Sequence, residues 1–144
     1  MKTRTMARLD LIAAETARRL LDEIRRHNAT LVQIAQQRGV LAGYRERLSE
    51  SWLSGDVVTA GQARRAGHFV AASRTADAQI NLMEAQTREQ LEVALQNLAK
   101  TQAHRRGLNE AQRKAALQEE RAATQQQERA LPWRPRPHSN GLKK

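Results

Sequence analysis

The sequence predicts an all-α protein: a long antiparallel two-helix coiled-coil hairpin with a disordered C-terminal tail that contains Pro and Arg. Ala, Glu, Lys, Leu and Arg make up more than half of the 144 residues, a composition typical of coiled coils and long helices. All three Pro lie at or after position 132, so none interrupts a helix before it. A Gly-containing break near residue 55 separates two stretches of heptad-spaced apolar residues, which predicts two helices.

The first predicted helix covers about residues 6–53. Mostly apolar side chains recur in it at alternating four- and three-residue steps, the heptad pattern of a coiled coil rather than the alternation of a strand. We call the positions in this pattern core positions. In the first helix they are Leu20, Ile24, His27, Leu31, Ile34, Arg38, Leu41, Arg45, Leu48 and Trp52. The helix is expected to be about 70 Å long at 1.5 Å per residue.

The connection is predicted at residues 54–59. Thr59 and Gln62 have the spacing of a capping box, in which the two residues satisfy each other's free backbone N–H groups. Thr59 is therefore the preferred N-cap of the second helix, with Asp56 as the alternative. A connection this short makes the two helices antiparallel neighbours.

The second predicted helix covers about residues 60–131 and ends before Pro132. Equal rise on both helices pairs positions whose numbers sum to about 113, so Leu20 is expected near Val93 and helix 2 has no partner beyond about Leu108. Residues 1–131 then form the hairpin, and residues 132–144 form a disordered basic tail. The predicted core positions of helix 2 are Phe69, Ala72, Ala76, Ile80, Met83, Thr87, Leu91, Ala94, Leu98, Thr101 and Leu108.

Several function classes are disfavoured by what the sequence lacks. The chain has no Cys, which removes disulfides, thiolate nucleophiles and Cys-ligated zinc. It also has no phosphate-binding loop, no His-Glu-x-x-His motif and no Gly-x-Ser-x-Gly motif. We therefore expect no enzyme, no cofactor, no metal and no small-molecule substrate. No signal-like or membrane-length apolar segment is found, so we expect a soluble cytoplasmic protein.

Two groups of residues near the predicted turn suggest binding or special packing. Arg38 and Arg45 fall at core positions, where an unpaired cation is costly. Each must extend to solvent, pair with an acid or mark where the helices diverge. Tyr44, Trp52 and Phe69 lie near the same end. A partner-binding patch and a small packed core under the turn explain these aromatic residues equally well.

Residues 33–48, QIAQQRGVLAGYRERL, are followed by the Gly-containing break and then by GHFV at residues 67–70. This arrangement resembles the FliJ family of flagellar export proteins, which shares its helical-hairpin architecture with the YscO stalks of injectisomes. The resemblance implies protein transport by type III secretion, in bacterial flagellum biogenesis and motility or in an injectisome. It implies a stalk that enters the pore of a hexameric export ATPase and contacts a membrane protein of the export gate, at the inner-membrane export apparatus.

Carried over residue by residue, the gate-contacting surface of the family falls on Gln33, Tyr44, Phe69 and Ala76. Flanking positions depart from the family pattern. Gln37 and Ser73 stand where apolar residues are usual, and Val40 stands where an aromatic residue is usual. The choice between flagellum and injectisome, the oligomeric state, the escort of export chaperones and any ligand of the tail residue Trp133 stay open.

Contact with the ATPase is expected on the N-terminal part of helix 1 and the C-terminal half of helix 2. A slim, Ala-rich coil fits a ring's central channel, and scattered Arg side chains can exchange among acidic partners around it. The alternative is that these arginines only solvate an exposed helix. The residues are Arg18, Arg25, Arg105, Arg106, Arg113 and Arg121.

Two other functions compete with the stalk. The formal charge of +10 suggests a nucleic-acid-associated coiled coil, although the basic residues are dispersed among acids rather than forming a phosphate-binding track. A salt titration of DNA binding would decide, because phosphate contacts give a steep salt dependence. The second alternative is an export chaperone that escorts substrates without contacting an ATPase.

Overall fold

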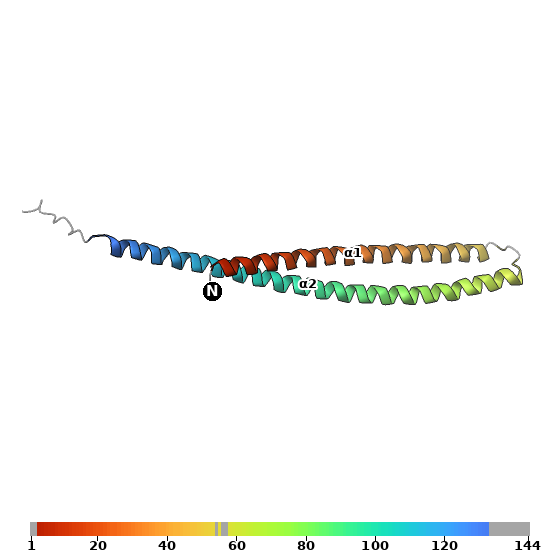
Figure 1. The fold of residues 1–144 in the computed structure, drawn as a ribbon. Coiled ribbons are helices and arrows are strands. Elements are labelled where there is room, and N and C mark those ends of the chain that lie inside the picture. The colour runs from red at the N-terminus through yellow and green to blue at the C-terminus, as the bar shows by residue number, and fades with distance from the viewer. Residues whose placement is uncertain (1–2, 54, 56–57, 133–144) are drawn as a thin grey trace, which may run out of the picture.

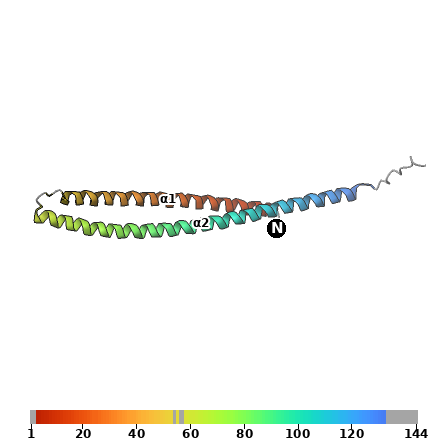
Figure 2. The ribbon, with the colours of Figure 1, turned by 180° about the vertical axis from the view of Figure 1, so that it is seen from behind.

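The computed structural model describes residues 3–53, 55 and 58–132, and this part of the chain contains two long helices (Figure 1). Helix α1 spans Thr3–Leu53 and helix α2 spans Ala60–Ala130. The two helices lie side by side and antiparallel in both ribbon views (Figure 2). The predicted all-α hairpin is therefore confirmed.

Helix α1 begins earlier than residue 6 because its first turn has a partner in α2. The Thr3 hydroxyl donates a hydrogen bond to Glu119 Oε1 at 3.1 Å. Met6 is only 6% exposed. Side chains at 111, 112 and 115 are also partly buried. Helix α2 is therefore partnered as far as Glu119, and the expectation that its partner ends near Leu108 was wrong.

The start of α2 is fixed by the predicted capping box. The Gln62 backbone N–H donates to Thr59 Oγ1 at 3.2 Å, and the Thr59 backbone N–H donates to Gln62 Oε1 at 3.0 Å. Thr59 is thus the N-cap, as predicted from the spacing. Gly55 has a φ of +76°, a left-handed conformation that Gly adopts without strain. The alternative cap, Asp56, lies outside the described residues.

Helix α2 ends one residue before the predicted position. The Leu131 N–H donates to the Gln127 carbonyl at 3.1 Å, and Leu131 itself is extended with ψ at 131°. An extended residue before Pro132 is expected, because the proline ring disfavours helical geometry at the preceding position. The predicted disordered tail, Trp133 included, lies beyond Pro132 and so outside the described residues.

The predicted core positions of α1 face α2, with one exception. Ile34 is 2% exposed, and Ala13 and Ala17 continue the buried row toward the N-terminus. All predicted positions from Leu20 to Leu48 are buried or half-buried. Trp52, the last predicted position, is 45% exposed. The heptad pattern therefore identified the contact face of α1 correctly up to its final turn.

The core of α2 differs from its predicted core at two positions. Ile80, Thr87, Ala94, Leu98 and Leu108 are buried as expected. Ala72 and Met83 are exposed instead. Their places are taken by the polar neighbours Ser73, which is 3% exposed, and Glu84, which is half-buried. Both polar residues bond to arginines of α1. An apolar pattern does not identify polar core residues, so the prediction selected the apolar neighbours Ala72 and Met83 instead.

The register also differs from the prediction. Val93, expected opposite Leu20, is 50% exposed. The observed contacts, such as Arg45 with Ser73 and Thr3 with Glu119, join α1 to residues further along α2. At the turn, the first part of α2 extends past the end of α1 (Figure 1). This offset moves every pairing along α2, and the equal-rise estimate did not include it.

Candidate partner-binding surfaces

Arg38 and Arg45 pair across the hairpin with polar residues of α2. Arg38 Nη2 lies 2.5 Å from Glu84 Oε2 and donates to Asn81 Oδ1 at 2.9 Å. Arg45 Nε donates to Ser73 Oγ at 2.6 Å, and its Nη2 pairs with Asp77. The sequence left three outcomes open for these two arginines. In the structure, each pairs with an acidic residue of α2.

Glu84 pairs with two arginines, one on each helix. The Arg38 hydrogen bond and then the Arg88 hydrogen bond hold the pKa of Glu84 below its ordinary value of 4.5. Arg88 Nε lies 3.0 Å from Glu84 Oε1 on the same helix. Glu84 therefore remains ionised over the neutral range and links the two helices through one carboxylate.

Ser73 is one of the two polar residues that stand where the resemblance leads one to expect an apolar residue. Its hydroxyl accepts a hydrogen bond from Arg45 in a site that is 3% exposed. An apolar side chain would leave the Arg45 Nε without this acceptor. Ser73 and Arg45 therefore belong together as one interhelix contact.

The aromatic residues near the turn are packed but remain accessible. The rings of Tyr44 and Phe69 make an edge-to-face contact, with centroids 6.4 Å apart and planes at 75°. The Arg47 guanidinium lies 4.6 Å from the centre of the Tyr44 ring, a favourable cation–π distance. Tyr44 is nevertheless 49% exposed. The pair therefore joins the two helices and still offers an aromatic surface to a partner.

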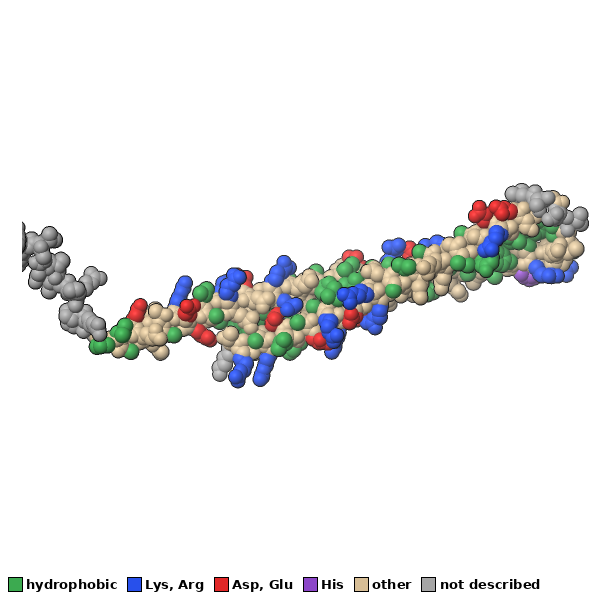
Figure 3. Space-filling view, turned by 90° about the horizontal axis from the view of Figure 1, so that it is seen from above, with side chains coloured by type: hydrophobic (Ala, Val, Ile, Leu, Met, Phe, Trp, Pro, Cys, Tyr) green, Lys and Arg blue, Asp and Glu red, His purple; other side chains and the backbone are tan. Residues whose placement is uncertain are grey.

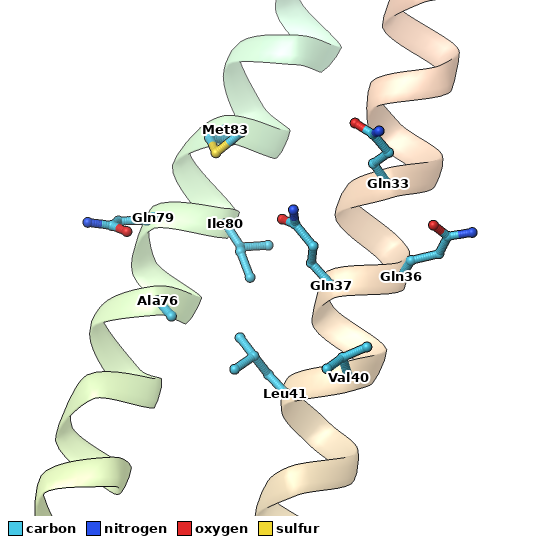
Figure 4. Close-up of a pocket in the computed structure, with 9 residues that line it drawn as sticks. All are labelled: Gln33, Gln36, Gln37, Val40, Leu41, Ala76, Gln79, Ile80 and Met83. Carbon is cyan, nitrogen blue, oxygen red and sulfur yellow. The ribbon is translucent and has the colours of Figure 1, made fainter.

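Gln33 and Ala76, the other two residues expected to contact the gate, line one open groove between α1 and α2. Figure 4 shows Leu41 and Ile80 pointing toward each other across this groove. Its volume is about 620 Å³. The complete lining is Gln33, Gln36, Gln37, Val40, Leu41, Ala76, Gln79, Ile80 and Met83.

The groove continues into a second stretch that the sequence analysis missed. This stretch is lined by side chains that include Thr30, Gln86, Gln90 and Val93. His27 lies in it as a half-buried core residue. The sequence signal for this stretch is that Gln86, Gln90 and Val93, which directly precede core positions of α2, are all uncharged. The heptad pattern of the core positions themselves does not include these residues.

The arginines expected to contact the ATPase differ in their ion pairs in three ways: some pair within α1, one pairs across the hairpin and the rest are unpaired among the described residues. Arg18 and Arg25 are exposed and pair within α1, at 2.8 Å to Glu15 and 3.7 Å to Asp22. Arg105 instead crosses to α1, where its Nε lies 3.1 Å from Asp10 Oδ1. Arg105 is thus a contact within the hairpin rather than a freely available side chain.

The other three arginines of this group are free to meet a partner. Arg106, Arg113 and Arg121 are exposed, and none forms an ion pair with another residue in the described part of the chain. Figure 3 shows positive and negative side chains interspersed along both helices. The face in view therefore offers separate positive points rather than a continuous basic track.

Neither helix, over residues 3–53 and 58–132, contains a stretch long and apolar enough to cross a membrane. The same residues include no group of three or more His, Cys, Asp or Glu placed to hold a metal ion. No protein-family model, no curated protein and no solved structure was found to match this chain.

Proposed function

We propose that this protein is a non-enzymatic coiled-coil stalk of the type III protein export apparatus, of flagellar or injectisome type. It binds the hexameric export ATPase at its open end and the export gate at its turn end, and it promotes assembly or activity of the ATPase. It acts in the cytoplasm, peripherally at the inner-membrane export apparatus. The observation that carries this proposal is the difference in chemistry between the two ends of the hairpin.

The open end is slim and polar. Past Glu119, α2 continues without α1 to Ala130, and every side chain over residues 120–130 is exposed. A single helix with its side chains is about 10 Å across, which suits insertion into the channel of a ring. The exposed Arg113 and Arg121 can pair in turn with acidic groups around such a channel without one deep pocket holding them.

The turn end has the opposite character. The exposed Tyr44 contacts the half-buried Phe69 there, and the groove with Gln33 and Ala76 begins beside this pair. Aromatic side chains in partly enclosed sites supply much of the binding energy of protein interfaces. This end therefore supports a longer-lived contact, as expected for attachment to the gate.

The test is a double charge reversal, Arg113→Glu with Arg121→Glu, in the full-length protein. Arg105 is left intact because its pairing with Asp10 holds the hairpin together. We expect stimulation of the purified export ATPase to fall by about tenfold or more, while far-UV circular dichroism and gate binding stay unchanged.

The matched control is Arg64→Glu with Arg74→Glu, which makes the same change of charge at the turn end. Arg64 and Arg74 are exposed and form no ion pair within the described residues. This variant should retain ATPase stimulation. Equal loss in both variants would indicate a dependence on net charge alone, and full stimulation by the first variant would exclude the open end as the ring contact.

A further inference from the structure

The groove between the helices follows a simple rule of position. On both helices, its outer walls are made by residues that directly precede core positions, such as Val40 before Leu41 and Gln79 before Ile80. In an antiparallel coiled coil, equivalent heptad positions of the two helices flank the same side of the interface. We call this side of the hairpin the groove face (Figure 4).

The groove face extends well beyond the stretch shown in Figure 4. Thr30 precedes Leu31, Gln86 precedes Thr87 and Val93 precedes Ala94, so the second stretch follows the same rule. The aromatic residue Tyr44 precedes Arg45 and lies on the same side, toward the turn. From Tyr44 back to Glu23 the face is about 30 Å long at 1.5 Å per residue.

The stretch of the groove face nearer the turn is lined by no charged residue, and the second stretch is lined by Glu23, Arg26 and Glu89. None of the residues that precede core positions is charged over 30–44 in α1 or over 69–97 in α2, although 28% of the chain is charged. The residues that directly follow core positions of α2 include Arg74, Arg88 and Glu92 on the other side. The positions that precede core residues and the positions that follow them thus differ in charge over these ranges.

Apolar side chains on the groove face are left exposed. Val40 is 55% exposed, Met83 is 46% exposed and Val93 is 50% exposed. Their spacing along the groove allows one apolar stripe of a partner helix to contact all three. The glutamines beside them can both donate and accept hydrogen bonds, as the polar edges of such a helix require.

The two ends of the groove face differ in charge. At the turn end, Arg47 precedes the core residue Leu48 and forms no ion pair with any described residue. At the other end, the groove is lined by Glu23, Arg26 and Glu89, so the formal charge there is negative. A bound segment would therefore meet uncompensated positive charge only beside the turn.

We propose that the groove face binds one amphipathic α-helix of a partner protein, with acidic residues at the end that lies beside Arg47, so that a three-helix bundle forms locally. The inference rests on the proposed gate-binding function of the turn end and deepens it by stating what the partner contributes. A second copy of the chain is disfavoured, because two concave faces do not fill each other and each chain carries a formal charge of +10.

The test uses synthetic helical peptides of about 20 residues, which match the length of the groove. The first peptide has a Leu and Ala stripe, Gln and Ser elsewhere, and three Glu at one end. A second peptide replaces the Glu by Lys, and a third interrupts the stripe with Pro. Titration calorimetry with the full-length protein should show that the second and third peptides bind at least about tenfold more weakly than the first.

Two protein variants locate the site. Val40→Glu places a charge on the groove face and should weaken binding of the first peptide by about tenfold or more. Val32→Glu is the matched control, because Val32 is 58% exposed and directly follows the core residue Leu31 on the other side. Its affinity should stay within about twofold of the parent.

Three outcomes would overturn the inference: no peptide binding, equal binding of the Glu and Lys peptides, or equal weakening by both variants. Dimerisation of the parent protein that Val40→Glu abolishes would also overturn it, by assigning the face to a second copy. Binding of purified gate protein is measured in parallel. Gate binding without peptide binding rejects only this inference, whereas peptide binding without gate binding rejects the proposed function.

Discussion

Arg38 and Arg45 keep their charge inside a narrow interface by reaching across it to acceptors on the other helix. Ser73 has room to be buried because it is small, and its hydroxyl meets the Arg45 Nε at 2.6 Å. Asp77 then accepts from the guanidinium end of the same side chain. The sequence predicted that these arginines needed compensation. It did not identify the partners, because partner choice depends on a register that periodicity leaves free.

Acid should weaken the hairpin through Glu84. Its pKa is held below 4.5 in the folded chain by Arg38 and then Arg88. As pH falls, the Glu84 carboxylate of the unfolded chain is therefore protonated at a higher pH than that of the folded chain. The stabilising contribution is therefore complete above about pH 4.5 and is lost as pH falls through the lowered folded pKa. Thermal unfolding followed by circular dichroism should show that the melting temperature of the parent exceeds that of Glu84→Gln at about pH 6 and that this difference disappears toward about pH 3.

The control for this measurement is Glu89→Gln. Glu89 is exposed and forms no ion pair within the described residues, so its substitution should leave the pH profile of the melting temperature nearly parallel to that of the parent. If Glu84→Gln melted with the same pH dependence as the parent, the ion pair with Arg38 would contribute nothing to stability in solution.

At the scale of the elements, the two helices differ in how well an apolar pattern identifies their contact faces. In α1 the row from Leu20 to Leu48 was predicted correctly. In α2 the choice of Ala72 and Met83 was wrong, because the core uses Ser73 and Glu84 there. Both misassigned residues directly precede core positions and therefore lie on the groove face. The prediction assigned Ala72 and Met83 to the core because the groove face also carries apolar residues.

A charge at the buried face of α1 should unfold the hairpin, whereas a charge two residues away should not. Ile34 is 2% exposed and Val32 is 58% exposed. Ile34→Asp buries a carboxylate without a partner at a cost of about 3 kcal/mol or more, and Val32→Asp should change stability by about 0.5 kcal/mol or less. Circular dichroism of both variants at equal concentration makes the comparison, and similar helix content in the two would contradict the assigned face.

For the whole molecule, the two-helix architecture, the capping box and the antiparallel connection were predictable because each depends on local sequence. The relative position of the helices was not, because α2 extends past α1 at the turn and so shifts all pairings. In the candidate sites, too, features that depend on local sequence were predictable and features that depend on the register of the helices were not. The family resemblance assigned Gln33 and Ala76 to a gate-contacting surface, and both line the groove, whereas the pairing of Arg105 with Asp10 depends on register.

The shifted register leads to a prediction about how stability is distributed along α2. Residues 80–108 pack against α1 through Ile80, Leu98 and Leu108, whereas residues 120–130 have no partner in the described chain and depend on helix propensity alone. An isolated helical segment of about this length is marginal in water. Hydrogen exchange followed by mass spectrometry should therefore show residues 120–130 exchanging almost as fast as an unfolded peptide and residues 80–108 protected by orders of magnitude. A chain that ends at Glu119 should melt within about 2 °C of the parent, because the deleted turns make no contact with α1. Equal protection of both segments would mean that the end of α2 pairs with another copy in solution, and protection that falls on dilution would identify that pairing.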